Sequence, residues 1–330
     1  MVDPMKPTLS RRRLLRAGGG LAAAAALGSA PFVAPGRARA NVDDSPRFNL
    51  PGSGDRPVDQ KSLHANWVMQ SFGYDNLNQH IYFLQRNVDN EDPKNIGDLW
   101  VTKTDTAGNE LGAMALHGFG HGVSIGVEPY NGSVYLWTEW QVNLKSTFGT
   151  RVGRFKFVDG ATLAQTDASI QDRTPSIGDT MVNPQPAIDP WSDRLLVRYR
   201  VSSTEARIVG FTMADARAGR VTTDYRKFER RIPDRTDGLD FQGYTALGRY
   251  AYLLYGKVSP TSFITTIDLN GTGQSIVDDF ETAAGTTLPG REPQGMAIWL
   301  APTGSRLAFG FHSNTDGERH ATVFDKNQFV

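Results

Sequence analysis

A short run of apolar and aromatic residues returns five times along this chain, at intervals of 53 to 61 residues. The five runs begin at Ile81, Val134, Leu195, Ala251 and Leu307. Each run follows a Gly- or Pro-rich segment and precedes a second apolar run that ends near an aspartate. One such repeat cannot bury its own apolar face, and repeats of about 40 to 50 residues or more are typical of propeller blades that stack to form a core. The sequence therefore predicts an all-β fold, a five-bladed β-propeller.

The composition favours strands and turns over helices. The apolar runs are four to six residues long, rich in Val, Ile, Tyr, Phe and Trp, and bounded by Gly, Pro, Asn and Asp. The 34 glycines and 18 prolines suit a chain with many turns. Because no stretch has the composition of a linker, we expect residues 61–330 to form one propeller domain, with residues 41–60 as an extended leader.

The first 40 residues have the pattern of an export signal. Ser10–Arg16 matches the twin-arginine motif, a weakly apolar stretch of Gly and Ala follows it, and Ala38–Ala40 supplies a small-x-small cleavage site. A membrane anchor is disfavoured because Pro31 and Pro35 interrupt the apolar stretch. Residues 1–40 are therefore predicted to be a twin-arginine signal peptide, and the mature protein is predicted to be secreted and to lack a membrane span.

Charge and cysteine content exclude several classes of protein. Seven of the 35 basic residues and one of the 35 acidic residues lie in the predicted signal, which leaves a formal net charge of about −6 on the rest of the chain. A mildly acidic chain lacks the clustered Lys and Arg that bind phosphate backbones, so we expect no nucleic-acid partner. The absence of cysteine from the sequence excludes disulfides and thiolate chemistry.

Four segments of the chain resemble the TagC-like family, which is labelled teichoic acid biosynthesis protein C. They are Gly118–Pro129, Val134–Glu139, Leu239–Tyr244 and Arg291–Met296. The resemblance extends over roughly residues 67–330. That family shares its five-bladed propeller with the receptor-binding protein of a staphylococcal phage. The resemblance implies a cell-wall glycopolymer, such as wall teichoic acid, as the ligand and partner, and an extracellular location at the cell wall.

The propeller fold predicts where ligand-binding residues should meet. The first strand of each blade lines the central channel, so side chains that precede these strands converge at one mouth although they are distant in sequence. We also expect Arg198 and Arg200 to share one face of a strand, by alternation. The ligand-binding candidates are His117, His121, Trp137, Arg198, Gln242, Tyr244, Arg291 and Gln294. Because the convergent positions differ from blade to blade, the sequence favours a single asymmetric site on the axis.

Four residues are candidates for catalysis: Glu128, Glu139, Glu292 and His121. Two carboxylates beside a glycosidic bond would suit a glycoside hydrolase. In a polysaccharide lyase, His121 or Tyr244 would act as a base while Arg291 neutralises a uronate. Structural roles compete with these interpretations, since Glu128 precedes a proline, Glu139 could pair with an arginine such as Arg151, and Arg291 could form an ion pair between blades.

The sequence predicts no metal and no cofactor. His117 and His121 are four residues apart, which on a strand separates them by about 13 Å, too far to share one ion. The Gly-x-Gly-x-Gly segment at 118–122 precedes a strand, whereas a dinucleotide-binding loop opens a helix. Three hypotheses remain open: a monomeric, secreted propeller that binds a glycopolymer without changing it, a secreted glycan-cleaving enzyme, and a platform for protein interactions.

Overall fold

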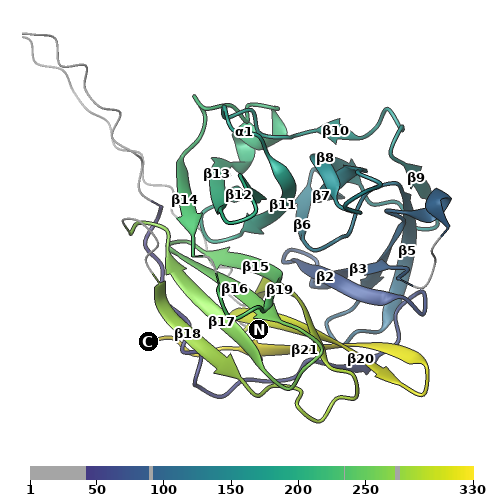
Figure 1. Ribbon diagram of the computed structural model, residues 1–330, viewed down its shortest axis with the longest axis vertical. Helices are drawn as coiled ribbons and strands as arrows, with labels where there is room; N and C mark the ends of the chain where they lie inside the picture. The colour runs from purple at the N-terminus through teal and green to yellow at the C-terminus, as the bar shows by residue number, and fades with distance from the viewer. Residues whose placement is uncertain (1–41, 89–91, 234, 272–275) are drawn as a thin grey trace, which may run out of the picture. The chain divides into compact units, whose positions relative to one another are not determined.

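The computed structural model describes residues 42–88, 92–233, 235–271 and 276–330. The propeller belongs to the compact unit Arg39–Val330. The predicted signal at 1–40 lies outside the described residues. Within those four ranges the strands form five sheets arranged around an axis (Figure 1), so the predicted five-bladed β-propeller is confirmed. In the same ranges no helix has the length and apolar character needed to cross a membrane.

The blades follow one another along the chain, each with its first strand innermost. The first contains β2 (Val68–Asp75), β3 (His80–Arg86), β4 (Leu99–Thr104) and β5 (Glu110–His117), extended by the parallel strand β9 (Thr162–Ala164). The second contains β6 (Ile125–Tyr130), β7 (Ser133–Val142), β8 (Gly149–Lys156) and β10 (Gln171–Asp172). The third contains β11 (Val182–Asp189), β12 (Arg194–Arg200), β13 (Ala206–Thr212) and β14 (Phe228–Ile232).

The last two blades complete the ring. The fourth contains β15 (Asp240–Leu247), β16 (Tyr250–Gly256), β17 (Ser262–Asp268) and β18 (Ile276–Thr282). The fifth contains β19 (Glu292–Ala301), β20 (Gly304–Thr315), β21 (Glu318–Lys326) and β1 (Val58–Lys61). Two short helical segments, η1 (Pro93–Asn95) and α1 (Met213–Arg217), lie between strands.

The two ends of the described part of the chain meet in the fifth blade. Strand β1 pairs antiparallel with β21, with Val58 opposite Val323, although some 260 residues separate them in sequence. Further upstream, Phe48 forms an isolated bridge with Phe329. Residues near both ends of the described chain therefore build one sheet, which closes the ring and covers an edge that would otherwise be open.

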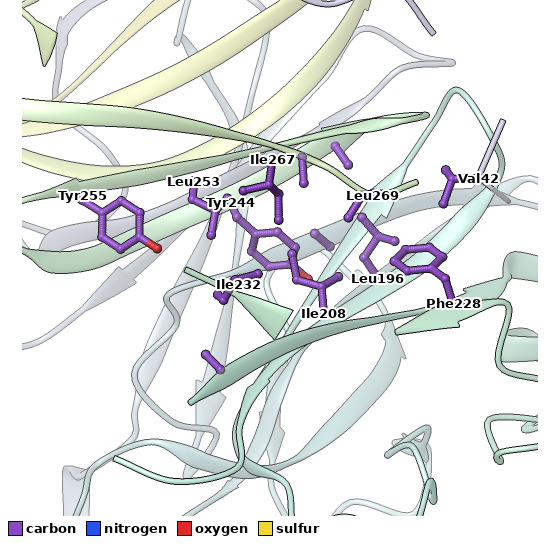
Figure 2. Packing of buried hydrophobic residues seen from close by; sticks show 14 residues of the cluster. Val42, Leu196, Ile208, Phe228, Ile232, Tyr244, Leu253, Tyr255, Ile267 and Leu269 are labelled. Atoms are coloured by element: carbon purple, nitrogen blue, oxygen red, sulfur yellow. The ribbon is translucent and has the colours of Figure 1, made fainter. Parts of the chain in front are cut away.

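The hydrophobic core lies between blades rather than within them. The described residues form five buried clusters, and each joins two neighbouring blades. Figure 2 shows the cluster between the third and fourth blades, whose labelled members include Leu196, Ile208, Phe228, Tyr244, Leu253 and Ile267. A single repeat would leave its sheet faces exposed to water, so the blades are stable only together.

Candidate functional site

An axial cavity of about 660 Å³ opens at the N-terminal ends of the innermost strands. Two quasi-equivalent rings of side chains line it, each with one residue from every blade. The deeper one, which we call the glutamine ring, consists of Gln70, Val123, Gln185, Gln242 and Gln294. The mouth ring lies two residues earlier in each repeat and consists of Val68, His121, Asn183, Asp240 and Glu292. Side chains from all five blades therefore converge at this mouth. The sequence predicted side chains that precede the first strands, whereas most of these lie within the strands.

Four blades place the same residue type in the deeper ring, which corrects the prediction that the convergent positions differ throughout. In each of these four blades the pairing register between the first and second strands shifts at the glutamine or, in β11, directly before it. In β2, for example, Met69 and Ser71 pair with consecutive residues of β3, so Gln70 is the extra residue of a bulge. Such bulges re-aim side chains. The asymmetry that the sequence analysis expected is confined to Val123 and the mouth ring.

The glutamines differ in their hydrogen bonds. The Gln185 Oε1 accepts a bond of 2.7 Å from an Arg198 Nη. Gln242 and Gln294 both bond to the Glu292 carboxylate. The side chain of Gln70 is 4% exposed and has no hydrogen-bond partner among the described residues. A buried amide is normally paired. Gln70 therefore presents an unused donor and acceptor to the cavity.

Three arginines add positive charge to the cavity wall. Arg86 ends β3, and Arg198 and Arg200 lie at the end of β12, on one face of that strand as alternation predicts. The Arg198 guanidinium lies 3.7 Å from the ring centroid of Phe241, which also lines the cavity. Arginine makes bidentate contacts with phosphate and carboxylate groups. The wall can therefore contact both hydroxyl groups and anions.

His121 reaches the cavity as a neutral imidazole. Its Nε2 lies 3.4 Å from an Arg86 Nη, which donates to it, and its ring stacks on Phe148 with centroids 4.6 Å apart. Burial, assisted by the positive charge of Arg86, lowers the pKa of His121 to about 3. At neutral pH this side chain is an acceptor already in use, and it is a weak base.

Glu139 lies behind His121 and does not line the cavity. Its carboxylate accepts backbone N–H bonds from Gly122 at 2.5 Å and from Gly149, and bonds to the N–H groups of His121 and Val123 also lower its pKa. Burial outweighs these bonds and raises the pKa of Glu139 to about 7. The carboxylate thus positions the loop that carries His121. The pairing with Arg151 considered above does not form, since Arg151 bonds Asp172.

The glycines of this loop are required by that packing. A Cβ on Gly120 would lie 2.7 Å from the Glu139 Cδ, and Gly120 and Gly122 both have φ in the left-handed half of the map, at 156° and 82°. Only glycine adopts such angles without strain while the chain passes this close to a side chain. The segment Gly118–Gly122 therefore packs closely around the buried Glu139 carboxylate.

Glu292 and Asp240 supply negative charge on the fourth and fifth blades. Both line the mouth of the cavity. Burial raises the pKa of Glu292, and the nearby negative charge of Asp240 raises it further, while the bonds from Gln294 and Gln242 lower it. The arginines, in contrast, come from the first and third blades. The cavity is therefore electrostatically polarised across its mouth.

Glu128 and Trp137 lie away from this cavity. Glu128 is near the C-terminal end of β6 and lines a second cavity, of about 200 Å³, together with residues from the later parts of the inner strands. Its oxygens accept bonds from Arg154 at 2.8 Å, Arg217 at 3.0 Å and the Trp137 Nε1 at 2.9 Å. Trp137 is fully buried. The structure gives both residues packing roles, and it brings neither Glu128 nor Glu139 together with Glu292.

Three further candidates, His117, Tyr244 and Arg291, also lie outside the cavity lining. His117 ends β5 in the first blade, whereas His121 precedes β6 of the second, and the His117 Nδ1 lies 2.7 Å from an Asp98 carboxylate oxygen. The buried Tyr244 hydroxyl donates to the Gln185 carbonyl at 2.9 Å, and burial raises its pKa.

Arg291 precedes β19 of the fifth blade and bridges to the fourth blade. Its guanidinium donates to the carbonyls of Ala284 and Ser259 and to the Ser262 hydroxyl, and it lies 4.0 Å from the ring centroid of Phe311. Burial lowers the pKa of Arg291 to about 10. The contacts are with neutral groups, so neither the anion site nor the inter-blade ion pair considered above is formed by these bonds.

Several residues that line the axial cavity were not predicted from the sequence. They are Val68, Gln70, Arg86, Val88, Val123, Phe148, Asn183, Asp240 and Phe241. A signal for Gln70 was present in the sequence. A glutamine followed by a small residue occurs near the start of the fourth and fifth blades, as Gln242-Gly243 and Gln294-Gly295, and the same pattern recurs in the first blade as Gln70-Ser71. Among the residues with described positions, no group of three or more His, Cys, Asp or Glu side chains is placed to hold a metal ion.

Comparisons with known proteins place this architecture. Residues 68–325 match the family described as the phage 5-bladed beta propeller receptor binding platform domain. A Bacillus subtilis (strain 168) protein named "Putative major teichoic acid biosynthesis protein C" is 27% identical over 268 residues, which are 78% of this chain and 59% of that protein. This chain therefore spans less than two thirds of that relative.

Solved structures show the same fold. The tail fiber of Staphylococcus aureus phage P68 superposes with a TM-score of 0.67 at 23% identity, over 84% of this chain and 53% of the fiber. A GH43_1 enzyme from Xanthomonas citri superposes with a TM-score of 0.48 at 11% identity, over 80% of this chain and 89% of the enzyme. The second similarity is too low to support an argument about activity.

Proposed function

The chain belongs to the family of phage five-bladed β-propeller receptor-binding platform domains, and from this premise we propose that it binds an anionic cell-wall glycopolymer, such as wall teichoic acid, in the axial cavity. The name of the Bacillus subtilis relative supports this class of ligand. The observation that carries the proposal is the glutamine ring beside three arginines, with a Gln70 amide that bonds no described residue.

The side chains that line the axial cavity match the chemistry of such a polymer. Glutamine amides offer both donors and acceptors, which the hydroxyls of a sugar or polyol require. Arg86, Arg198 and Arg200 supply charged donors for a phosphodiester or a uronate. A mixed lining of neutral amides and guanidinium groups therefore favours a polymer that alternates hydroxyl-rich units with anionic groups.

The contacts favour binding over cleavage. Of the four predicted catalytic candidates, His121 and Glu292 line the cavity, whereas Glu128 and Glu139 do not. His121 is a weak base with its Nε2 engaged by Arg86. A hydrolase would need Glu292 to act with a carboxylate outside the predicted set, such as Asp240. Cleavage is thus the alternative outcome of the binding experiment.

Binding is tested with purified protein and Gram-positive cell walls, either intact or stripped of teichoic acid with hydrofluoric acid. We expect the protein to sediment with intact walls and to remain in solution with stripped walls. Release of soluble fragments with new reducing ends, or with the ultraviolet absorbance of an unsaturated uronate, would instead establish an enzyme. Neither sedimentation nor release, with teichoic acid or with uronate-containing glycans, would overturn the proposal.

A pair of arginine variants makes the test specific to the cavity. Arg200→Ala should weaken wall binding about tenfold, the size expected for losing a charged hydrogen bond. Arg220→Ala is the control, because Arg220 is an exposed arginine of the same blade that pairs with Asp215 outside the cavity. Equal losses in both variants would indicate non-specific attraction to the anionic wall.

Export and assembly form part of the same proposal. We infer that residues 1–40 direct the protein through the twin-arginine route to the cell wall, where it acts as a monomer. Replacing Arg11 and Arg12 with lysine should retain the protein in the cytoplasm, as cell fractionation would show. Secretion of that variant at the normal level would contradict the twin-arginine assignment.

A further inference from the structure

The axial cavity has a closed floor directly below the glutamine ring. The next residue in each blade is Ser71, Ser124, Pro186, Gly243 or Gly295, and all five are buried. None of the five lines the axial cavity or the smaller cavity at the other end of the axis, and the two cavities share no lining residue. This tier, which we call the floor, therefore separates the two cavities.

Close approach of neighbouring backbones explains the floor. A Cβ on Gly243 would lie 2.7 Å from the Gly295 Cα, and a Cβ on Gly295 would lie 2.7 Å from the Ser71 Cα. Distances under 3.0 Å are not found for real Cβ atoms, so glycine is what lets these inner strands meet.

Hydrogen bonds tie the rest of the floor together. The Ser71 hydroxyl donates to the Gly122 carbonyl at 2.6 Å, and the Ser124 hydroxyl donates to the Pro186 carbonyl at 2.6 Å. These bonds join the first blade to the second and the second to the third. A polymer that enters the mouth therefore cannot thread along the axis and must leave on the side from which it entered.

A groove leads away from the mouth between the third and fourth blades. It has a volume of about 450 Å³ and shares Arg198, Arg200, Asp240 and Phe241 with the axial cavity. It continues outward to Arg235. The shared residues make the two spaces continuous, and two of the three cavity arginines stand at the junction.

From this geometry we infer that the protein recognises the end of an anionic glycopolymer. The terminal unit occupies the axial cavity, with its hydroxyls on the Gln70 amide and the glutamine ring. The first anionic group contacts Arg198 and Arg200 at the junction, and the following units lie in the groove. This inference rests on the proposed function and adds to it, because a glycopolymer-binding protein could equally bind repeating units along the chain.

The stoichiometry of binding distinguishes the two modes. Purified wall teichoic acid is separated by length without hydrolysis, so that every fraction keeps its natural ends, and each fraction is titrated by calorimetry. End recognition predicts about one protein per polymer chain in every fraction. A number of bound proteins that rises with chain length would overturn end recognition while leaving the proposed function intact. Binding by none of the fractions would overturn the proposed function itself.

Two variants assign the subsites. Gln70→Ala should weaken binding of a one-unit fragment and of longer chains alike, by about tenfold. Thr204→Trp places a bulky side chain in the groove and should weaken only fragments longer than one or two units. Equal weakening of all lengths by Thr204→Trp, or no effect on any length, would contradict the groove assignment.

Two controls keep these readings specific. Gln328→Ala changes an exposed glutamine near the C-terminus, and Thr150→Trp places the same bulk on β8, outside the axial cavity and its groove. Both should bind like the unaltered protein. Near-ultraviolet circular dichroism of each variant reports whether the fold is kept.

Discussion

The cavities at the two ends of the propeller axis both have polar side chains in their lining but use them differently. At the lower end, the Glu128 carboxylate is held by Arg154, Arg217 and Trp137. At the upper end, the Gln70 amide has no partner among described residues, although it is almost completely buried. Buried polar groups normally find partners within the fold. The contrast indicates that the lower end, with the smaller cavity, is built for stability. The upper end, with the axial cavity, keeps hydrogen-bonding capacity for a ligand.

Backbone regularity follows the same division. In β2, the register shift lies at Gln70, whereas the following residues from Ser71 to Asp75 pair with β3 without interruption. Bulges also occur at the mouth in β11, β15 and β19. Irregular pairing gives up ladder hydrogen bonds in exchange for side-chain direction. The inner strands therefore lose regular ladder hydrogen bonds at the mouth, where the side chains of the site must point into the cavity.

The largest expected effect tests the lower end. Arg154→Ala leaves the buried Glu128 without its closest charged partner and should lower the free energy of unfolding by about 3 to 5 kcal/mol. Chemical denaturation measures this loss. Wall binding by the folded fraction should be unchanged, because Arg154 does not line the axial cavity. Lost binding with normal stability would reverse the roles assigned to the two ends.

A pH profile tests the carboxylate behind the mouth. Because the pKa of Glu139 is raised to about 7, the folded state holds a proton that the unfolded state releases above about pH 4.5. The Glu139 contribution to stability is therefore full below pH 4.5 and is lost as the pH rises to 7, by up to about 3 kcal/mol in total.

Glu139→Gln should remove the pH-dependent contribution of Glu139 to the free energy of unfolding. The stability of the variant relative to the unaltered protein should then rise between pH 4.5 and 7 and stay level above pH 7, whatever other groups titrate in both proteins. Denaturation midpoints measured at several pH values give the difference. A difference that is constant across this window would show that Glu139 has an ordinary pKa in the folded state.

Arg291 tests whether a residue near the mouth that does not line the cavity takes part in binding. Arg291→Ala removes bonds to three neutral oxygen atoms and should lower the free energy of unfolding by about 2 kcal/mol. Affinity for teichoic acid, measured by calorimetry on the folded protein, should not change. A clear loss of affinity without a loss of stability would return Arg291 to the ligand-binding set.

The smallest expected effect on stability belongs to Gln70. Since its amide bonds no described residue, Gln70→Ala should change the free energy of unfolding by less than about 0.5 kcal/mol. Thermal and chemical denaturation provide the measurement. A loss above 1 kcal/mol would mean that Gln70 stabilises the fold, and the contrast between the two ends would fail at its most informative residue.

The candidate site was only partly predictable, and the failures have local causes. Gln242, Glu292 and Gln294 were expected at the mouth, and all three line the axial cavity. Arg291 was expected beside them, but adjacent strand residues point to opposite faces, so Glu292 faces the cavity and Arg291 faces Phe311. Tyr244 lies two residues after Gln242, yet the bulge at Gln242 breaks the alternation between them and Tyr244 packs towards the third blade.

The sequence by itself determined the number of blades, because the period of its apolar runs and the need to bury their faces are properties of the chain alone. It also indicated that residues before the first strands converge. Only the tertiary structure decided which of those side chains face the axis, because bulges and the glycine-lined floor arise from contacts between strands of different blades. Such contacts join residues some 50 or more positions apart, and no local pattern encodes their register.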